Sequence, residues 1–410
     1  MHKLESISSR AMNVPVPSVR IAFIATSYIK QRDGVSVYIE NLLAELLYQG
    51  HGLAVGIDKI DVIIGQQSLA LLSSLLQRQL QRLGCEEEMD RTMFYAVSDT
   101  YFGWECWQMP RLLWKNGLYD LIVMPNPRPI LFTGGPVLTI LHDLTFKVGG
   151  RRFPTWRRFY LDLLNTWRLA RDDFIGFISH STRDAVLKYY SWGAKRPLML
   201  LPNGLPFKVA WVKRPPATQV EQKIAELCLS CLVVGRPNYL KGFDRVINAC
   251  EAIDTQLERS DVSITLHVVG KNASDTERLL PHNALGRIDI KLHGYVDDEA
   301  LNALYRDSAL CFFLSRNEGF GLPLMEALWF RCVPILSDIP IFREVMGDDF
   351  PLFDMEGAYG EAIGHFIVRL RDEEAFRQGL LEKMERVLAA HCDGYATAAR
   401  KVIKLCTAPQ

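Results

Sequence analysis

The feature of this sequence that most constrains its fold is the alternation of short apolar runs with longer segments that have helical spacing. The runs are rich in Val, Ile and Leu, and polar or turn-forming residues follow each of them. Strands of a parallel sheet are buried on both faces, so they appear in a sequence as continuous apolar runs of this kind. In the first half of the chain we expect strands at residues 19–26, 53–57, 120–126, 136–143, 173–181 and 197–204. In the second half we expect them at residues 229–235, 263–270, 288–295, 309–315 and 333–338.

Helical segments separate several of these predicted strands, which produces strand–helix–strand units. The spacing of apolar residues predicts helices over 35–50, 69–84, 182–193, 243–253, 298–308, 322–330 and 372–406. Pro215 and Pro216 interrupt the pattern between the two halves. We therefore expect an α/β protein with two domains, each a parallel sheet covered by helices on both faces. The expected limits are a flexible leader over 1–18, a first domain over 19–210, a second domain over 211–388 and a terminal helix over 389–410.

The composition is that of a globular protein without a strong charge bias. Of 410 residues, 49% are hydrophobic and 23% charged, and the 47 basic residues equal the 47 acidic ones. The neutral total argues against a nucleic-acid partner. The nine cysteines include one close pair, Cys228 and Cys231, in a run expected to be a buried strand, so we expect free thiols and a reducing cytoplasm. The leader has no apolar signal-peptide region, and no uncharged apolar run is long enough to cross a membrane.

Because ligands of parallel sheets bind outside the carboxyl ends of the strands, the residues that follow each predicted strand are the candidates for a site. After the strand at 309–315 comes "RNEGFGLPLMEAL", in which Glu318 and Glu326 flank a glycine-rich turn. The turn glycines allow close backbone approach, and Pro323 suits the first turn of a helix. The alternative is a capped helix with a first-turn acid. The glycines and the strand-end position favour a functional role for both glutamates.

Three further strand-end loops carry candidate binding residues. Arg236 and Lys241, in "VVGRPNYLKGFDRV", suit a diphosphate, although two solvated loop cations would look the same. His142, in "LTILHDLTF", either binds a substrate hydroxyl or is a structural histidine. Gly34 either lets a phosphate approach the start of the helix behind it or is a plain turn glycine.

The segment 151–171 is rich in arginine and aromatic residues. Its members are Arg151, Arg152, Phe153, Trp156, Arg157, Arg158, Phe159, Tyr160, Trp167, Arg168 and Arg171. This composition fits contact with membrane headgroups or with a lipid-linked anion. A solvated helix face is the commonest alternative, and an RNA surface is disfavoured by the neutral total.

Taken together, these motifs resemble the retaining glycosyltransferases of family four, which have the two-domain GT-B fold. The E-x7-E signature of that family is matched by Glu318 and Glu326. Further matching motifs are "GVSVYIENLLAEL", "LHDLTF", "ISHSTRD", "LPNGLP", "VVGRPNYLKGFDRVI", "HGYVDDEALNALY" and "VPILSDIPIFREVMGDD". The resemblance covers most of the chain from about Val19 onward. Within the family, the sequence most resembles bacterial mannosyltransferases of O-antigen or capsule synthesis. The resemblance implies two Rossmann-like domains facing across a cleft, the first on the acceptor side and the second binding the nucleotide sugar. It also implies a C-terminal helix that crosses back to the first domain.

The resemblance also implies a role for each matching residue. Glu318 would hold donor-sugar hydroxyls, and Glu326 the ribose hydroxyls of the nucleotide. Arg236 and Lys241 would bind the diphosphate, and the turn residues Phe320, Gly321 and Leu322 would contact both sugar and diphosphate. His142 would lie near the 6-hydroxyl of the sugar, and Gly34 would approach the phosphate or the acceptor. The base would be held by the "GYV" turn, which consists of Gly294, Tyr295 and Val296. Three positions depart from the family: Asp33 precedes Gly34, Trp329 and Phe330 replace small residues, and His180 replaces Glu or Arg.

The implied activity is transfer of a hexose, with retention, from a nucleoside diphosphate sugar to a glycan or lipid-linked saccharide in surface polysaccharide synthesis. GDP-mannose is the first candidate donor. The alternatives are a UDP-glucose or UDP-GlcNAc transferase and a non-catalytic nucleotide-sugar-binding paralogue. No cofactor or metal is expected, because Arg236 and Lys241 would meet the diphosphate charge. The expected location is the cytoplasm, with peripheral contact at the inner face of the cell membrane through 151–171.

Overall fold

The structure is a computed structural model of the 410-residue chain. It describes residues 19–29, 33–52, 57–98, 107–131, 133–148, 154–226, 228–257, 262–270 and 285–407. The predicted leader 1–18 and Arg151, Arg152 and Phe153 of the basic segment lie outside these ranges.

The first domain is built on a seven-stranded parallel sheet with the order β3-β2-β1-β4-β5-β6-β7. Its strands are β1 (Val19–Ile24), β2 (Ile57–Gly65), β3 (Thr92–Val97), β4 (Leu121–Met124), β5 (Val137–Leu141), β6 (Phe174–Phe177) and β7 (Leu198–Leu200). The chain order reverses between β1 and β4, which is where an open parallel sheet leaves a crevice for a ligand.

Helices cover both faces of this sheet. They are α1 (Gly34–Gly52), α2 (Gln66–Leu83), α4 (Met109–Lys115), α5 (Thr145–Val148), α6 (Thr155–Arg171) and α7 (His180–Tyr189), with short 3-10 turns η1 (Glu86–Arg91) and η4 (Ser191–Lys195). Helix α1 is buried along most of its length and carries two buried acids, Glu40 and Glu45. Glu40 accepts a hydrogen bond from the Tyr28 hydroxyl at 2.6 Å.

The second domain is built on a six-stranded parallel sheet with the order β10-β9-β8-β11-β12-β13. Its strands are β8 (Cys228–Val234), β9 (Ser263–Val269), β10 (Ile288–Gly294), β11 (Leu310–Phe313), β12 (Val333–Ser337) and β13 (Leu352–Phe353). The reversal here lies between β8 and β11, so the second crevice is expected where these two strands end.

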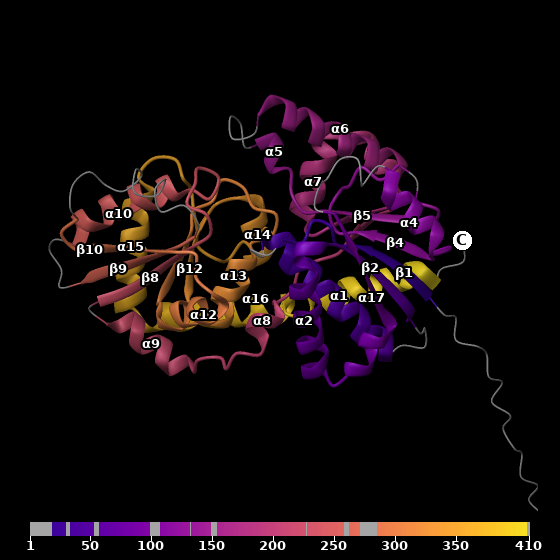
Figure 1. The fold of residues 1–410 in the computed structure, drawn as a ribbon. Helices are drawn as coiled ribbons and strands as arrows, with labels where there is room; N and C mark the ends of the chain where they lie inside the picture. The colour runs from indigo at the N-terminus through magenta and orange to yellow at the C-terminus, as the bar shows by residue number, and fades with distance from the viewer. Residues whose placement is uncertain are drawn as a thin grey trace, which may run out of the picture.

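The second domain also carries helices on both faces of its sheet. They are α8 (Phe207–Ala210) and α9 (Ala217–Ala225), which follow β7, and then α10 (Phe243–Leu257), α12 (Asp298–Asp307), α13 (Leu322–Trp329), α14 (Pro340–Met346) and α15 (Tyr359–Asp372). Figure 1 shows the two sheets side by side, with α13 and α14 on the side of the second domain that faces the first.

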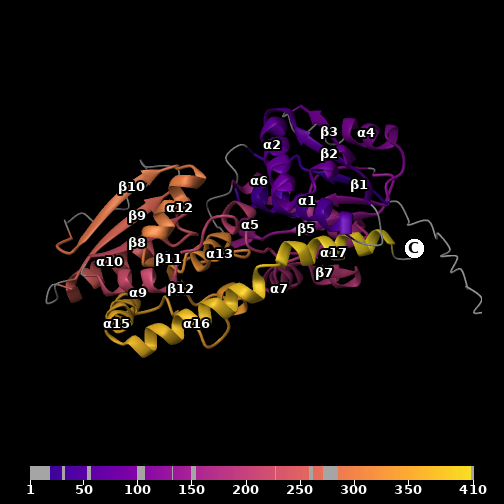
Figure 2. The same ribbon diagram turned by 90° about the horizontal axis from the view of Figure 1, so that it is seen from below.

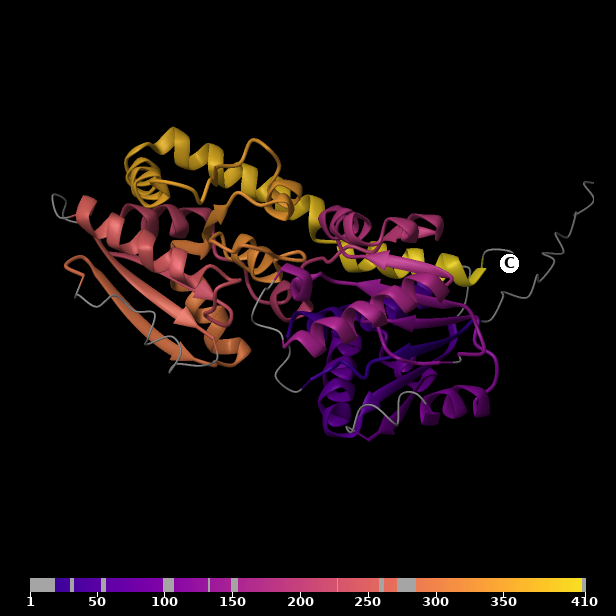
Figure 3. The same ribbon diagram turned by 90° about the horizontal axis from the view of Figure 1, so that it is seen from above.

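The end of the chain returns to the first domain. Helix α16 (Glu374–His391) lies along the second domain, and α17 (Gly394–Thr407) packs against α1. Figures 2 and 3 show the two helices running from one domain to the other. Ala398, Ala399, Val402 and Ile403 of α17 are buried. Two parallel-sheet domains and a returning C-terminal helix are therefore confirmed.

Two strands differ from the sequence analysis. The expected strand at 53–57 lies outside the described residues except for Ile57, and the sequence analysis predicted neither β2 over Ile57–Gly65 nor β3. Asp58, Lys59 and Asp61 interrupt the apolar pattern of β2. The buried Asp61 is accommodated by Lys59, at 3.0 Å, and by the Tyr119 hydroxyl, at 2.6 Å. Strand β3 lies at the edge of the sheet and is only partly buried, so it has no continuous apolar run.

Candidate functional site

A lysine, a glutamate and a serine meet in a narrow hollow at the carboxyl ends of β8 and β11. The Lys241 ammonium donates to both carboxylate oxygens of Glu318, at 2.7 Å each. The Ser315 hydroxyl donates to Oε1 of the same carboxylate at 2.8 Å. Arg236 lines the same hollow with an exposed side chain. The structure thus brings together three predicted site residues from two loops, at the point where the order of the second sheet reverses.

The loop that carries Arg236 and Lys241 is held against the end of β11 by a glycine. Gly242 has a φ of 65°, and a Cβ there would collide with the backbone carbonyl of Leu314. Only glycine combines this dihedral with so close an approach. On the other side of the loop, the Asn238 side chain accepts from the Lys241 amide at 3.1 Å. Local backbone geometry therefore fixes Lys241 beside Glu318.

The glycine-rich turn places Glu326 inside helix α13, as its spacing predicts. Gly321 caps the helix with a φ of 91°, and Pro323 lies in the first turn. Glu326 is buried and forms an ion pair with Lys208 of α8 at 2.8 Å. Lys208 Nζ is also 3.6 Å from Asp298, the first residue of α12. The sequence analysis missed Lys208, although a lysine directly after "LPNGLPF" stands in the segment that links the domains.

His142 lies at the first-domain side of the junction. Its Nε2 is 2.7 Å from the carbonyl oxygen of Pro125, and its ring meets the Tyr38 ring edge-on at 4.8 Å. Burial lowers the pKa of His142 below its usual value, and the bond to Pro125 opposes that shift. Since a carbonyl only accepts, Nε2 carries the proton of the neutral ring, which leaves Nδ1 as an acceptor.

The turn after β11 touches the first domain directly. A Cβ on Gly319 would collide with the backbone carbonyl of His142. Helix α7 closes the same contact, because Ser179 Oγ donates to the Gly319 carbonyl at 2.9 Å and Thr182 Oγ1 donates to the His142 carbonyl at 3.1 Å. The two strand ends that carry Glu318 and His142 are therefore in van der Waals reach across the domain junction.

A second contact at α7 involves the second domain's α14. The backbone amides of His180 and Ser181 donate to the Glu344 carboxylate at 2.7 and 2.6 Å. Amides at a helix N-terminus attract an anion, and here a glutamate of the other domain supplies it. The position of His180 thus serves this contact through its backbone. The signal in the sequence was "SHST", a capping pattern at the end of a predicted strand.

Gly34 is the first residue of α1 and lies across the junction from α13, since a Cβ there would come within 3.9 Å of Leu322 Cδ1. The Asp33 carboxylate accepts from the Ser36 amide at 2.9 Å and from its hydroxyl at 2.8 Å. A phosphate at this helix end would meet that carboxylate, which is unfavourable. The role of Gly34 in phosphate binding stays a prediction.

The other predicted residues lie around α13 and β10. Phe320 is buried, with its ring 6.2 Å from that of His391 in α16, and Leu322 is largely buried. Tyr295 is exposed, and Val296 packs partly buried against the core. Both follow Gly294, whose φ is 65°.

The basic-aromatic segment is divided between surface and core. Trp156, Phe159 and Leu163 of α6 are exposed. Arg168 is buried, forms an ion pair with Asp172 at 2.9 Å and donates to the Ile130 carbonyl. Counting Arg168 with the surface cations is therefore wrong, because its guanidinium anchors α6 to the sheet.

In the described part of the chain, no three His, Cys, Asp or Glu side chains are arranged to hold a metal ion. The described cysteines are free thiols. No helix in the described ranges is both long enough and apolar enough to cross a membrane.

Residues 222–362 match the family described as glycosyl transferases group 1. The matched segment contains Arg236 and Lys241, the two cations of the hollow, and Glu318 and Glu326, the glutamates of the two ion pairs.

The chain is also similar to known bacterial proteins over part of its length. The chain is 35% identical over 120 residues to the serotype-specific mannosyltransferase WbdA of Escherichia coli, a stretch that covers 28% of this chain and 14% of WbdA. It is 25% identical over 129 residues to an uncharacterized 41.2 kDa protein in the cps region of Klebsiella pneumoniae, which covers 31% of this chain and 33% of that protein. The chain thus spans a small part of WbdA.

Solved structures share the complete fold. The structure of HepE from Anabaena in complex with UDP and glucose aligns with a TM-score of 0.66 at 12% identity, over 95% of this chain and 100% of that one. The structure of WaaG, a glycosyltransferase involved in lipopolysaccharide biosynthesis, aligns with a TM-score of 0.63 at 15% identity, over 95% and 100%. The fold is that of the GT-B glycosyltransferases.

Proposed function

We propose that this protein is a retaining glycosyltransferase that moves a hexose from a nucleoside diphosphate sugar to a hydroxyl of a glycan or lipid-linked saccharide in surface polysaccharide synthesis. The observation that carries the proposal is the convergence of Lys241, Glu318 and Arg236 in one hollow, in contact with the strand end of His142. Cations and an acid in one cleft suit a ligand with a diphosphate at one point and hydroxyls at the next.

The proposed donor is GDP-mannose, with a UDP-sugar as the alternative. Support for mannose comes from the similarity to the mannosyltransferase WbdA, whose aligned stretch is 120 residues long. UDP-sugars are the second candidate because the structure of HepE was solved in complex with UDP and glucose.

In the proposed reaction, the bond between the anomeric carbon and the phosphate oxygen breaks, and its electron pair leaves with the nucleoside diphosphate. The acceptor oxygen bonds to the anomeric carbon on the same face, and its proton passes to the leaving phosphate oxygen. Negative charge grows on that phosphate. Lys241, Arg236 and the amides at the start of α13 would stabilise it, and each preorganised cation contributes about 3 kcal/mol. A bound diphosphate would attract the Lys241 ammonium away from Glu318. The Glu318 carboxylate would then accept hydrogen bonds from sugar hydroxyls.

A ligand series tests this proposal. Thermal unfolding is measured with GDP, UDP and ADP, and then turnover with GDP-mannose, UDP-glucose and UDP-GlcNAc. We expect GDP to raise the melting temperature most, GDP-mannose to be turned over, and EDTA to leave turnover unchanged because the cations meet the phosphate charge. Stabilisation by a nucleotide without turnover of any sugar would favour a non-catalytic binding protein. No stabilisation and no turnover would refute the proposal.

We also propose that the protein works in the cytoplasm and contacts the membrane surface through α6. Trp156, Phe159 and Leu163 are 71%, 70% and 57% exposed and lie three to seven residues apart, so they share one face of the helix. Arg157 and Arg158 follow Trp156 directly. Exposed aromatic and aliphatic side chains beside arginines suit the headgroup region of an anionic membrane.

Vesicle co-sedimentation tests the membrane contact. With vesicles that contain anionic lipid, a Trp156→Ser/Phe159→Ser variant should lose most of the binding of the unaltered protein, because apolar burial supplies much of it. Trp114→Ser is the matched control, since Trp114 of α4 is 84% exposed on another helix. Equal loss in the control, or unchanged binding in the α6 variant, would contradict the proposal.

A further inference from the structure

A cavity of about 650 Å³ opens at the carboxyl ends of β1, β4 and β5, under α5 and the first turns of α6. It lies at the reversal point of the first sheet, the counterpart of the hollow in the second. Its volume is within the ~300–1,000 Å³ of typical small-molecule sites. His142 lines it and touches Gly319 through its backbone carbonyl, so the cavity opens beside the proposed donor sugar.

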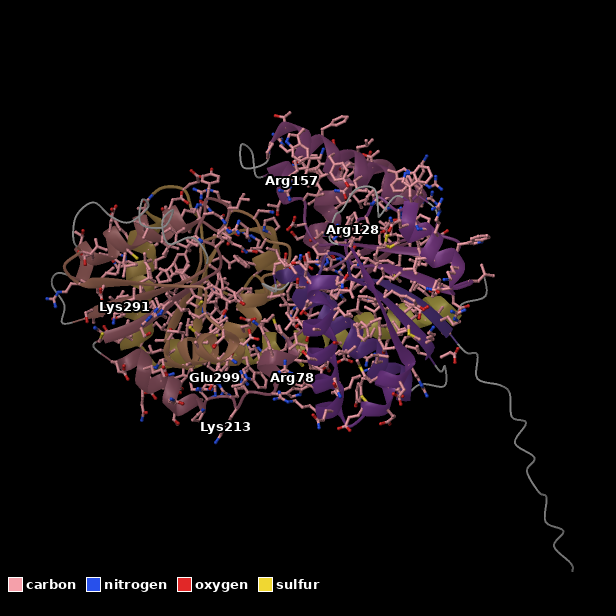
Figure 4. All side chains as sticks on the ribbon, in the orientation of Figure 1. Arg78, Arg128, Arg157, Lys213, Lys291 and Glu299 are labelled. Carbon is pink, nitrogen blue, oxygen red and sulfur yellow. The ribbon has the colours of Figure 1, made fainter. Side chains whose placement is uncertain are left out.

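Two arginines from different elements line this cavity. Arg128 comes from the segment between β4 and β5, and Arg157 from the first turn of α6. Figure 4 labels both on the first domain, on the side of α5 and α6. Among the described residues that line the cavity, Asp143 is the one acid, and its carboxylate accepts from the Thr145 amide at 2.8 Å. With His142 neutral, the lining has an excess of positive charge.

Aromatic and amide side chains complete the lining. Trp156, Tyr160 and Phe146 are among the lining residues, and aromatic rings are surfaces on which the apolar face of a sugar can pack. Asn126 and Asn165 supply amides that donate to and accept from hydroxyls. Guanidinium groups match phosphate and carboxylate oxygens in a planar fork, which hydroxyls alone do not need.

The family resemblance implies that the acceptor binds on the first domain, and we propose that an acceptor in this cavity carries an anionic group, a phosphate or a carboxylate, next to the sugar that receives the hexose. Arg128 and Arg157 bind the anion, and the aromatic rings bind the sugar. The inference rests on the proposed glycosyl transfer and names its acceptor class. The anion is supplied either by the phosphate of a lipid linkage or by the carboxylate of an acidic sugar.

A charged membrane surface would also attract arginines of α6, and the neighbouring Arg158 separates the two explanations. Arg158 follows Arg157 in the chain but does not line the cavity. A membrane surface acts on both charges alike, whereas a ligand in the cavity depends on Arg157 alone.

The test is calorimetric titration of the full chain with three probes: mannose 1-phosphate, methyl glucuronide and methyl α-mannoside. We expect at least one anionic probe to bind more tightly than the neutral one. Arg128→Gln and Arg157→Gln should each weaken that binding about tenfold or more and leave the neutral probe unaffected. Arg158→Gln, the matched control, should change neither. Preference for the phosphate assigns the anion to the linkage, and preference for the uronate assigns it to the sugar.

The donor hollow is excluded by the same titrations on Lys241→Ala, in which binding of the anionic probe should persist. The inference is overturned if only Lys241→Ala loses binding of the anionic probe, or if Arg158→Gln loses as much binding as the cavity variants. It is also overturned if neither anionic probe binds more tightly than the neutral one, or if no probe binds. None of these titrations uses a nucleotide. A failure here is therefore distinct from a failure of the proposed transferase activity, which the nucleotide-sugar series measures.

Discussion

The two glutamates of the turn after β11 each bind a lysine, but the two ion pairs differ in position and burial. Glu318 pairs with Lys241 of the same domain, and their side chains are 12% and 37% exposed. Glu326 pairs with Lys208 of the segment linking the domains, and these side chains are 4% and 16% exposed. The first pair faces the hollow, and the second is enclosed between α8 and α13.

This difference separates a pair that a ligand can enter from a pair that joins structural elements. An exposed ion pair contributes little to stability, because water screens it and solvates each partner. A buried pair is strongly coupled, because removal of one partner leaves an uncompensated charge. We therefore expect changes at Lys241 to act on catalysis and changes at Lys208 to act first on stability.

The largest predicted effect is on turnover. Lys241→Ala, or Arg236→Ala, should lower kcat about a hundredfold or more, because each removes a cation from the charge that grows on the leaving phosphate. The melting temperature should change little, since Lys241 is more than a third exposed. Steady-state kinetics on the best donor, with unfolding curves beside them, measure both quantities.

Lys291→Ala is the control for lost surface charge, since Lys291 lies on β10, away from the hollow and labelled in Figure 4. It should keep normal turnover. If Lys241→Ala and Arg236→Ala both keep near-normal turnover, the diphosphate assignment is refuted.

The fold was predictable from the sequence wherever strands were apolar throughout. Strands β8, β11 and β12 are continuous apolar runs, and the sequence analysis found them within two residues of their limits. Strand β2 was missed because Asp61 is buried among apolar neighbours with its own cation and hydroxyl partners. A buried charge looks like a surface residue until its partners, here Lys59 and Tyr119, are known.

The candidate site shows the same limit. Strand-end positions and glycines predicted Arg236, Lys241 and Glu318, because parallel strands bring their carboxyl ends to one edge. Lys208 was not predictable in this way. Its partner Glu326 lies 118 positions away, and only the path of the linking segment over α13 brings them together. The excess of positive charge around Arg128 and Arg157 likewise depends on how α6 folds over the sheet.

The smaller predicted effect tests the buried pair. Lys208→Met keeps the length and apolar stem of the side chain but leaves the Glu326 carboxylate buried without its cation. It should lower the free energy of unfolding by about 2 kcal/mol, less than for a fully buried pair because Lys208 is partly exposed. Chemical denaturation at neutral pH measures the change, and Lys241→Met, in the exposed pair, should change it by less than about 1 kcal/mol.

A double-mutant cycle decides whether this loss comes from the pair itself. In a Glu326→Gln background the buried charge is absent, so Lys208→Met should then destabilise the protein far less than in the unaltered chain. A coupling energy of about 1 kcal/mol or more would establish that α8 and α13 are joined through these two side chains. Additive effects would show that Lys208 acts through its packing alone. In that case the two glutamates would differ only in burial, and the charge of Glu326 on α13 would not be coupled energetically to Lys208 of the linking segment.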